Sequence, residues 1–312
     1  MTLLERPPAG SLHRAQETKI EMHRHARRAL GPAAFVNYVE PSSALAEIVE
    51  AIADWDVPDS GMARTTAANV LPSTRPWVIF QYRVSMKSVR QFGKVEHSIA
   101  PYRHVATRHQ TGVLTVRFDG PLGAIIVRLK PEAAARLIGE RMQDFADVKV
   151  DLGSVFGAAG ISLLEEQLSE ARNTGERFGI VESFLHANVG PSEPDAVACG
   201  AAAQLRRNPC FRIRGLAAQL DVSERHLCRR FRMMFGMSPK QFARTARLET
   251  ALAARRKTSS WAEVACACGF ADQAHLINDF NDIIGHPPGA CMFSSCAERR
   301  LANPPSGRFL LW

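Results

Sequence analysis

The sequence predicts an α+β N-terminal domain followed by an all-α C-terminal domain, in which a long helix joins two helix-turn-helix units. Three observations predict this fold class. Runs of β-branched and aromatic residues, bounded by Pro or Gly, lie in the first half of the chain. A proline-rich polar break at residues 190–194 separates them from a basic region with helical periodicity. That region contains one pattern twice, about 48 residues apart.

Length and composition fit two domains. The 312 residues are 46% hydrophobic, which is enough to bury two ordinary cores. No run of 18 apolar residues occurs, and the N-terminus lacks the apolar stretch of a secretory signal. The seven cysteines form no small-domain disulfide framework and fit a reducing compartment. We therefore predict a cytoplasmic protein with no membrane partner.

The N-terminal part mixes helix and strand signals. Residues 1–30 are predicted to be a flexible basic tail, with at most a marginal helix over residues 15–30. Residues 31–190 are predicted to form a sensing or dimerisation domain. A helix is predicted over residues 42–53 from the helical spacing of Leu45, Ile48, Val49 and Ile52. Further strands are predicted over residues 77–84, 112–118 and 124–129, and helices over residues 133–143 (after Pro131), 161–171 and 175–188.

The repeated pattern occupies residues 216–239 and residues 264–288. Each copy has an apolar pair, a turn that ends on an apolar residue, a Leu, a Phe four residues later and a closing G-x-x-P. These positions are Leu216/Ala217 and Val264/Ala265, Val222 and Phe270, Leu227 and Leu276, Phe231 and Phe280, then Gly236 to Pro239 and Gly285 to Pro288. This is the spacing of a helix-turn-helix, and a doubled unit on a basic chain indicates DNA binding.

Capping residues divide the C-terminal region into helices. A short helix is predicted from an apolar stripe made of Ile213, Leu216, Ala217 and Leu220. Asp221 and Val222 form the turn, and Ser223 is a favourable N-cap for a helix over residues 224–235. Ser238, with Pro239 and Gln241 after it, opens a long helix that can run to about Arg256. Its length of roughly 27 Å is close to one turn of duplex, ~34 Å.

Charge is concentrated around the first copy of the pattern. Residues 205–257 contain fourteen basic and three acidic residues, a net charge of +11, whereas the whole chain carries +8. A positive field of this kind attracts phosphate backbones and releases their counterions. A solvated basic helix face would be the alternative interpretation if the repeat were absent.

These residues resemble the AraC/XylS-type transcription regulators, whose DNA-binding domain has two helix-turn-helix units joined by a long helix. The resemblance covers residues 196–296, about a third of the chain. It rests on Leu216-Ala217, Ser223, Leu227, Arg229 with Phe231, Gly236 to Pro239, Arg247, Ala265, Gly269-Phe270, Asp272-Gln273, Phe280 and Gly285. It implies a linker over residues 191–198, a DNA-binding domain over residues 199–296 and a C-terminal tail over residues 297–312.

The resemblance also implies roles for individual residues. The first recognition helix would present Arg225, His226, Cys228 and Arg229 to the DNA groove, and the second would present Gln273, Ala274, His275 and Asn278. Arg suits a bidentate contact to guanine, and Gln and Asn suit adenine. Phosphate contacts are expected from Arg214, Arg230, Lys240 and Arg244. The core would contain Leu216, Leu220, Leu227, Phe231, Val264, Leu276 and Phe280. Each exposed candidate could instead contact phosphate or form plain surface.

The second unit departs from the family pattern. Members commonly have a basic residue two places before the second-unit Phe and a serine four places further back, where this chain has Asn278 and Ala274. Residues 258–296 contain four acidic residues and neither Lys nor Arg. We therefore expect the first unit to anchor the protein electrostatically and the second to contribute less affinity.

The resemblance implies a DNA-binding activator whose partners are double-stranded DNA and, for activation, RNA polymerase. The N-terminal part is weakly similar to sensing modules of such regulators, in Leu71-Pro72 and in residues 123–139. A small-molecule effector or a protein partner is expected there, with its identity open. Whether the protein forms a homodimer is also open.

Two other classes stay open from the sequence: an enzyme whose C-terminal domain only targets it to DNA, and a DNA-binding anchor without regulatory input. His97, His104, His109, Ser98 and Asp119 include acid/base residue types, but without mechanistic spacing. Cys266, Cys268, Cys291 and Cys296 form no C-x-x-C pair, and residues two apart on a helix point apart. We predict no enzyme, no catalytic residues, no metal and no cofactor.

Overall fold

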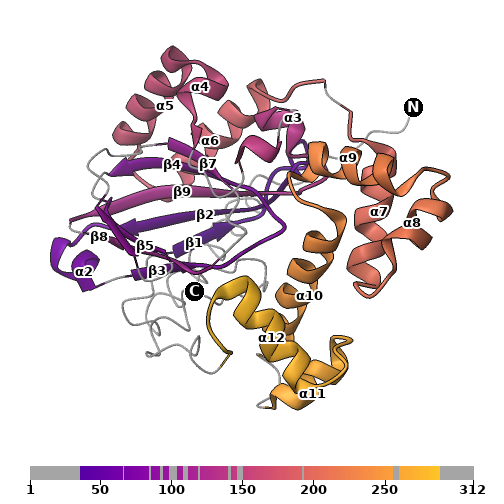
Figure 1. The fold of residues 1–312 in the computed structure, drawn as a ribbon. Coiled ribbons are helices and arrows are strands. Elements are labelled where there is room, and N and C mark those ends of the chain that lie inside the picture. The colour runs from indigo at the N-terminus through magenta and orange to yellow at the C-terminus, as the bar shows by residue number, and fades with distance from the viewer. Residues whose placement is uncertain are drawn as a thin grey trace, which may run out of the picture.

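The computed structural model describes residues 36–288, apart from residues 66, 84–85, 92–93, 98–103, 108–111, 119, 140–141, 146–149, 192 and 256–259. The predicted tails, including the marginal helix over residues 15–30, lie outside the described residues. A β-rich domain is followed by an all-helical region (Figure 1). The predicted fold class is confirmed.

Two antiparallel sheets form the N-terminal domain. The six-stranded sheet has the order β1 (Val36–Val39), β2 (Val49–Val57), β9 (Leu122–Leu129), β4 (Trp77–Arg83), β7 (His104–Thr107) and β10 (Val150–Asp151). The four-stranded sheet has the order β3 (Ala67–Val70), β8 (Leu114–Phe118), β5 (Met86–Gln91) and β6 (Lys94–His97). The three predicted strands are confirmed as β4, β8 and β9.

The helix predicted over residues 42–53 is wrong. Leu45 and Ile48 lie in a turn, and strand β2 begins at Val49. Strand β2 pairs with β1 on one side and with β9 on the other, so the backbone hydrogen bonds of this segment go to its neighbours in the sheet. Because both faces of β2 are largely buried, its sequence does not alternate between apolar and polar residues. Tertiary pairing therefore overrode a short stretch of helical spacing.

The helix predicted over residues 133–143 is interrupted. Helix α3 (Ala135–Ile138) ends at Gly139, whose φ of 96° favours glycine. A separate 3-10 turn, η2 (Met142–Phe145), follows. The short α4 (Gly153–Phe156) then precedes α5 (Ala158–Glu170) and α6 (Thr174–Ala187), which confirm the other two predicted helices. A further short helix, α2 (Ser60–Thr65), follows β2.

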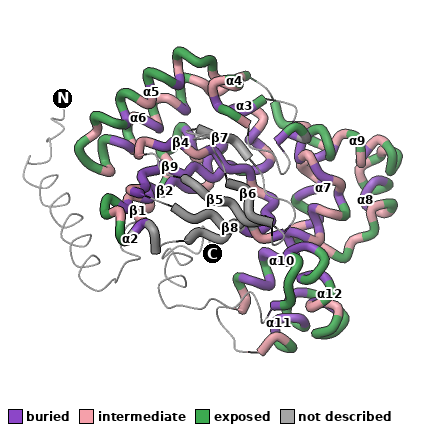
Figure 2. Tube along the Cα trace, turned by 60° about the vertical axis from the view of Figure 1, so that its left-hand side comes forward, coloured by how far each residue is buried: buried purple, intermediate pink, exposed green. Residues whose placement is uncertain are grey.

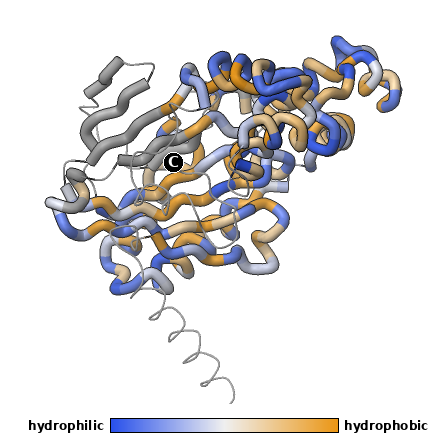
Figure 3. The backbone as a smooth tube through the Cα atoms, turned by 90° about the horizontal axis from the view of Figure 1, so that it is seen from below, coloured by the Kyte–Doolittle hydropathy of each residue, from blue (hydrophilic) through white to orange (hydrophobic). Residues whose placement is uncertain are grey.

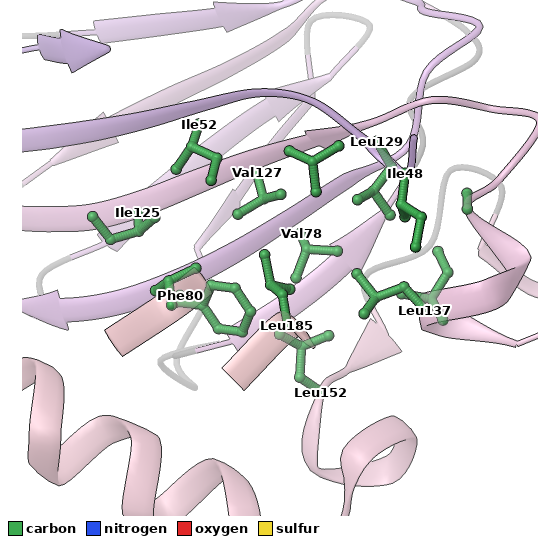
Figure 4. Close-up of a cluster of buried hydrophobic side chains, with 14 of the residues drawn as sticks. Ile48, Ile52, Val78, Phe80, Ile125, Val127, Leu129, Leu137, Leu152 and Leu185 are labelled. Atoms are coloured by element: carbon green, nitrogen blue, oxygen red, sulfur yellow. The ribbon is translucent and has the colours of Figure 1, made fainter. Parts of the chain in front are cut away.

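The six-stranded sheet is buried on both faces, and helices α3 to α6 cover one of them (Figures 1 and 2). On the helix side, apolar side chains of the strands meet those of the helices (Figure 4). They include Ile48, Ile52, Val78, Phe80, Ile125, Val127, Leu129, Leu137, Leu152 and Leu185. On the opposite face, Trp55 and Trp77 pack with small residues of β2 and β9. The hydrophobic residues accordingly concentrate along the strands (Figure 3).

A buried ionic cluster fastens α6 to the sheet. Arg177 contacts Asp54 Oδ2 at 2.9 Å and Asp56 Oδ2 at 3.1 Å. The Tyr82 hydroxyl donates to Asp54 Oδ1 at 2.6 Å, and burial followed by the two neighbouring carboxylates raises the pKa of Tyr82. Pairing the fully buried Asp54 in this way avoids the large cost of an isolated buried charge.

The C-terminal region consists of six helices within the described residues. They are α7 (Ala196–Arg207), α8 (Ile213–Gln219), α9 (Glu224–Phe235), α10 (Pro239–Arg255), α11 (Trp261–Ala267) and α12 (Gln273–Ile284). Helix α10 separates a first unit, α7 to α9, from a second unit, α11 and α12 (Figure 1). Within the part of the chain that the structure describes, no helix has the length and apolarity needed to cross a bilayer.

Candidate DNA-binding surface

Helix α9 has the caps and the buried face of a well-defined recognition helix. Ser223 accepts a hydrogen bond from the His226 N–H at 3.2 Å, and Gly236 ends the helix in the left-handed conformation. The predicted N-cap and bounds of this helix are confirmed. Leu227 and Phe231 are fully buried, and the Phe231 ring lies 5.2 Å from that of Phe242 on α10. These contacts fix α9 on the start of the long helix.

Helix α12 repeats this construction in the second unit. Asp272 accepts from the His275 N–H at 2.7 Å, and Gly285 ends the helix with a φ of 84°. Leu276 and Phe280 are fully buried. The seven predicted core residues lie in the two cores, six of them buried and Leu220 partly so. Each unit therefore offers one capped helix whose opposite side faces solvent.

Helix α10 joins the two units and holds α12 through ion pairs. Its 17 residues span roughly 26 Å. Arg247 contacts Asp279 Oδ2 at 2.5 Å, and Arg244 contacts Asp279 Oδ1 at 2.8 Å and Asp282 Oδ2 at 2.7 Å. Although burial by itself lowers the pKa of Arg244, hydrogen bonds to Asp282 and Asp279 raise it overall. The orientation of α12 relative to α10 is thus set by charged contacts as well as by the apolar core.

The side chains predicted to read bases lie near the starts of the two helices. Arg225 and Arg229 on α9 are exposed, and Gln273, Ala274 and Asn278 on α12 are exposed as well. His226, Cys228 and His275 are half-buried.

His275 also has structural contacts. Its Nδ1 accepts from the Ala271 N–H at 3.4 Å, and its Nε2 lies 3.5 Å from Arg247 Nη2. These contacts limit how freely the His275 ring can turn toward a groove.

The four predicted phosphate contacts divide into two kinds. Arg214 and Lys240 are exposed and form no ion pair with any residue that the structure describes. Arg244 is paired with α12, and Arg230 contacts Asp195 Oδ2 at 2.6 Å. Burial acts to raise the pKa of Asp195, but the hydrogen bond from Arg230 and those from the backbone of α7 lower it overall. Arg230 and Arg244 would have to exchange these carboxylates for phosphates.

A groove of about 750 Å³ lies between the two units. Basic side chains line it from both sides, namely Arg212, Arg214, Lys240, Arg244 and Arg247, together with His275. Glu224, at the start of α9, and His275, on the first turn of α12, both belong to its lining. The groove therefore opens between the N-terminal ends of the two recognition helices.

Sequence reasoning missed the contacts that hold the units in place. Asp279 looked like part of a local negative charge, yet it is 6% exposed and pairs with two arginines of α10. Glu249 was counted as one of three acids in a basic segment, but its side chain is buried against the N-terminal domain. The only available signal was the presence of acidic residues at buried helical positions, and it does not identify their partners.

Within the described residues, no group of three or more His, Cys, Asp or Glu side chains is placed to hold a metal ion. Cys291 and Cys296 lie outside those residues, as do the side chains of His97, His104 and His109.

Residues 216–292 match the family model for a helix-turn-helix domain (HTH_18). The match covers both units, the capped helices and α10. This is an AraC-type helix-turn-helix domain. AraC-type domains are the DNA-binding part of transcription regulators, so the expected family is confirmed for this region and DNA is the partner of its surface. Residues 37–151 of the chain match a second family model, a domain of unknown function (DUF6597).

Solved structures with AraC-type domains are among those similar to this chain. Apo ToxT from Vibrio cholerae has 12% identity and a TM-score of 0.44, covering 77% of this chain and 95% of its own. ToxT from the same organism, solved with an unsaturated fatty acid bound, has 10% identity, a TM-score of 0.39, and coverages of 77% and 93%. The AraC-like transcriptional activator CuxR has 16% identity, a TM-score of 0.26, and coverages of 72% and 89%. A comparison with curated protein sequences gives no match.

Proposed function

We propose that the protein is a sequence-specific transcription activator that places α9 and α12 in adjacent major grooves on one face of the duplex. The observation that carries this proposal is the pair of capped helices at opposite ends of α10. With ~26 Å of α10 between them, the two helices are spaced for successive turns of DNA, which repeat every ~34 Å.

Base contacts come from the exposed first turns of the two helices. Arg225 and Arg229 are long enough and free enough to bind guanine edges, and Gln273 and Asn278 suit adenine. The half-buried His226, Cys228 and His275, and the short Ala274, contribute through shape and van der Waals contact. Arg214 and Lys240 neutralise phosphates from the rim of the groove between the units.

The test begins with duplexes selected from a random-sequence library by the unmodified full chain. Hydroxyl-radical footprinting of such a duplex should show two protected segments about 10 base pairs apart. Arg229→Ala should weaken protection of one segment and Asn278→Ala that of the other. Arg172→Ala, at an exposed position between α5 and α6, is the matched control and should change neither. A full chain that selects no duplex would contradict the proposal.

Activation is tested separately in cells. Mapping of the bound sites should identify neighbouring promoters, and transcription from these should fall when the gene is deleted. A rise in transcription would assign repression instead. An activator acts on RNA polymerase, so a two-component binding assay with polymerase on the selected duplex completes the test.

We also propose that the sheet domain receives the regulatory input, from a small molecule or a protein. The sheet face opposite the helices carries Trp55 and Trp77, and the Gln81 amide oxygen on it is buried without a hydrogen-bond partner in the described structure. An amide oxygen in this state favours a donor from outside the chain. Isothermal titration of the full chain with cell-extract fractions identifies the class of ligand, and Gln81→Leu should abolish the heat of binding.

A further inference from the structure

The cores of the two helix-turn-helix units differ in one respect. The first unit's core is drawn from residues 197–243 alone. The second unit's core includes Leu71, which is 6% exposed, and packs against Val113, and both residues belong to the N-terminal domain. The same domain also contacts α12 through its backbone, since the Gly112 N–H donates to the Ile283 carbonyl oxygen at 2.8 Å. The second unit is therefore completed by the sheet domain, whereas the first is self-contained.

Residues 71–76, which we name the docking loop, also surround a buried carboxylate of α10. Ser73 Oγ and the Thr74 N–H donate to Glu249 Oε1 at 2.8 and 3.0 Å. Thr74 Oγ1 and Arg75 Nη1 donate to Glu249 Oε2 at 2.9 and 2.7 Å. Each oxygen thus accepts two hydrogen bonds, so the desolvation of Glu249 is offset only while the docking loop is in place.

The docking loop is tied in turn to the centre of the six-stranded sheet. Arg75 Nε contacts Glu50 Oε2 at 2.6 Å, and Arg128 Nε contacts the same oxygen at 2.8 Å. Glu50 lies at a register shift of β2, and Arg128 lies on the neighbouring β9. A continuous chain of charged contacts therefore runs from two central strands through Arg75 to α10.

The contacts between the sheet domain and the first unit are of another kind. The η2 turn lies against α9, and Arg206 of α7 pairs with Glu132. The side chains of this pair are 31% and 27% exposed, and solvent-exposed ion pairs of this sort contribute little to stability. The sheet domain is thus coupled far more strongly to the second unit than to the first.

We infer that the docking loop and Glu249 form a coupling element through which the sheet domain controls the second helix-turn-helix unit and leaves the first unit constitutively formed. This inference rests on the proposed function for its consequence on DNA. Seating of the loop keeps α12 in its reading orientation. A change at β2 or β9 that withdraws Arg75 loosens α11 and α12, and the protein then holds DNA through α9 alone.

Hydrogen exchange on the full chain tests the coupling without DNA. Leu71→Ala should speed exchange of amides in α11 and α12 by on the order of tenfold or more, because truncating a buried Leu leaves a cavity. Exchange in α8 and α9 should stay unchanged. Thr74→Val, which removes a hydroxyl donor to Glu249, should act in the same direction, and Thr74→Ser should restore the original rate. Glu132→Gln, at the exposed contact with the first unit, is the control. Equal acceleration in both units, or none in α11 and α12, would overturn the inference.

Footprinting separates this inference from the proposed function. On a duplex selected by the unmodified chain, Glu249→Gln should lose the segment that Asn278→Ala weakens and keep the segment that Arg229→Ala weakens. If the unmodified chain protects both segments and Glu249→Gln loses both or neither, the coupling is wrong while the regulator assignment stands. If the unmodified chain selects no duplex, the proposed function fails, and the exchange experiment still decides the coupling.

Discussion

At the residue scale, the two recognition helices carry side chains of different charge and reach. Arg225 and Arg229 extend from α9, whereas α12 presents Gln273, Ala274 and Asn278. The negative charge of the second unit is smaller in effect than its sequence indicates, because Asp279 and Asp282 are paired with α10. The contrast between the units nevertheless persists in the side chains that face solvent.

Replacing one reading residue in each unit should therefore have unequal effects. Arg229→Ala should weaken binding to a selected duplex by ~1–3 kcal/mol, because it removes a charged bidentate donor. Asn278→Ala should cost less, since it removes a neutral amide from the unit with fewer exposed cations. Fluorescence anisotropy titrations at one fixed salt concentration measure both. Equal losses would show that the second unit contributes as much affinity as the first.

The Asp279 carboxylate should be more important to stability than the neighbouring Asp282. Asp279→Asn leaves Arg247, whose side chain is 9% exposed, without its ionic partner, and should destabilise the protein by ~3–5 kcal/mol. Asp282→Asn is the matched control, because that side chain is 64% exposed and should cost at most ~1 kcal/mol. Urea unfolding followed by far-UV circular dichroism compares the two. Similar losses would mean that burial does not set the strength of these pairs.

At the element scale, caps and buried faces define the C-terminal helices, whereas pairing partners define the strands. Helix α9 has the predicted bounds because Ser223 and Gly236 end it by local hydrogen bonding and backbone conformation. Strand β2 has no such local signal, and its two neighbours β1 and β9 decide its conformation. Signals for helices in this chain were therefore readable where those for β2 were misleading.

Removing the cap of the first recognition helix should weaken that unit. Ser223→Ala deletes the side-chain acceptor of the His226 N–H and should reduce the free energy of unfolding by about 1 kcal/mol. Ser223→Asp keeps an acceptor and adds a favourable charge at the helix N-terminus, so it should retain stability. Thermal unfolding of the three proteins provides the measurement. A loss in Ser223→Asp as large as that in Ser223→Ala would contradict the capping role.

At the scale of the whole molecule, the two domains are joined by a buried ionic cluster that responds to pH. Burial by itself raises the pKa of Glu249, but Arg75 and hydrogen bonds from Ser73 and Thr74 lower it overall, below its ordinary value of 4.5. Burial likewise opposes ionisation of Glu50, and contacts with Arg128 and Arg75 again lower its pKa overall. Both carboxylates therefore bind fewer protons in the folded state than in the unfolded state.

The free energy of unfolding should accordingly fall on acidification. The contribution of Glu249 is complete above the pKa of the unfolded chain, near 4.5, and is lost as the pH falls through the lower folded-state pKa. Urea unfolding between pH 7 and pH 3 measures this slope. Glu249→Gln should start less stable at pH 7 and lose less on acidification. An unchanged slope in Glu249→Gln would show that another carboxylate dominates.

The net charge of the whole chain should make DNA binding strongly dependent on salt. Each phosphate neutralised by Lys or Arg contributes about −0.9 to the slope of log K against log salt. Replacing both Arg214 and Lys240 with Ala should reduce the magnitude of that slope by about 2, whereas Arg230→Ala should change it less because Arg230 is paired with Asp195. Anisotropy titrations across a salt series measure the slopes. A flat dependence in the unmodified chain would exclude phosphate anchoring.

The sequence by itself determined the two helix-turn-helix units and the family of their domain. Helical periodicity, N-caps and glycine C-caps act between residues within a few turns of one another, so their effect can be read from neighbouring letters. Only the tertiary structure decided the course of β2, the pairing of Asp279 with α10 and the burial of Glu249 under Ser73 and Thr74. The last contact joins residues about 175 positions apart. Its partners are selected by which surfaces meet when the domains pack, and no local pattern encodes that choice.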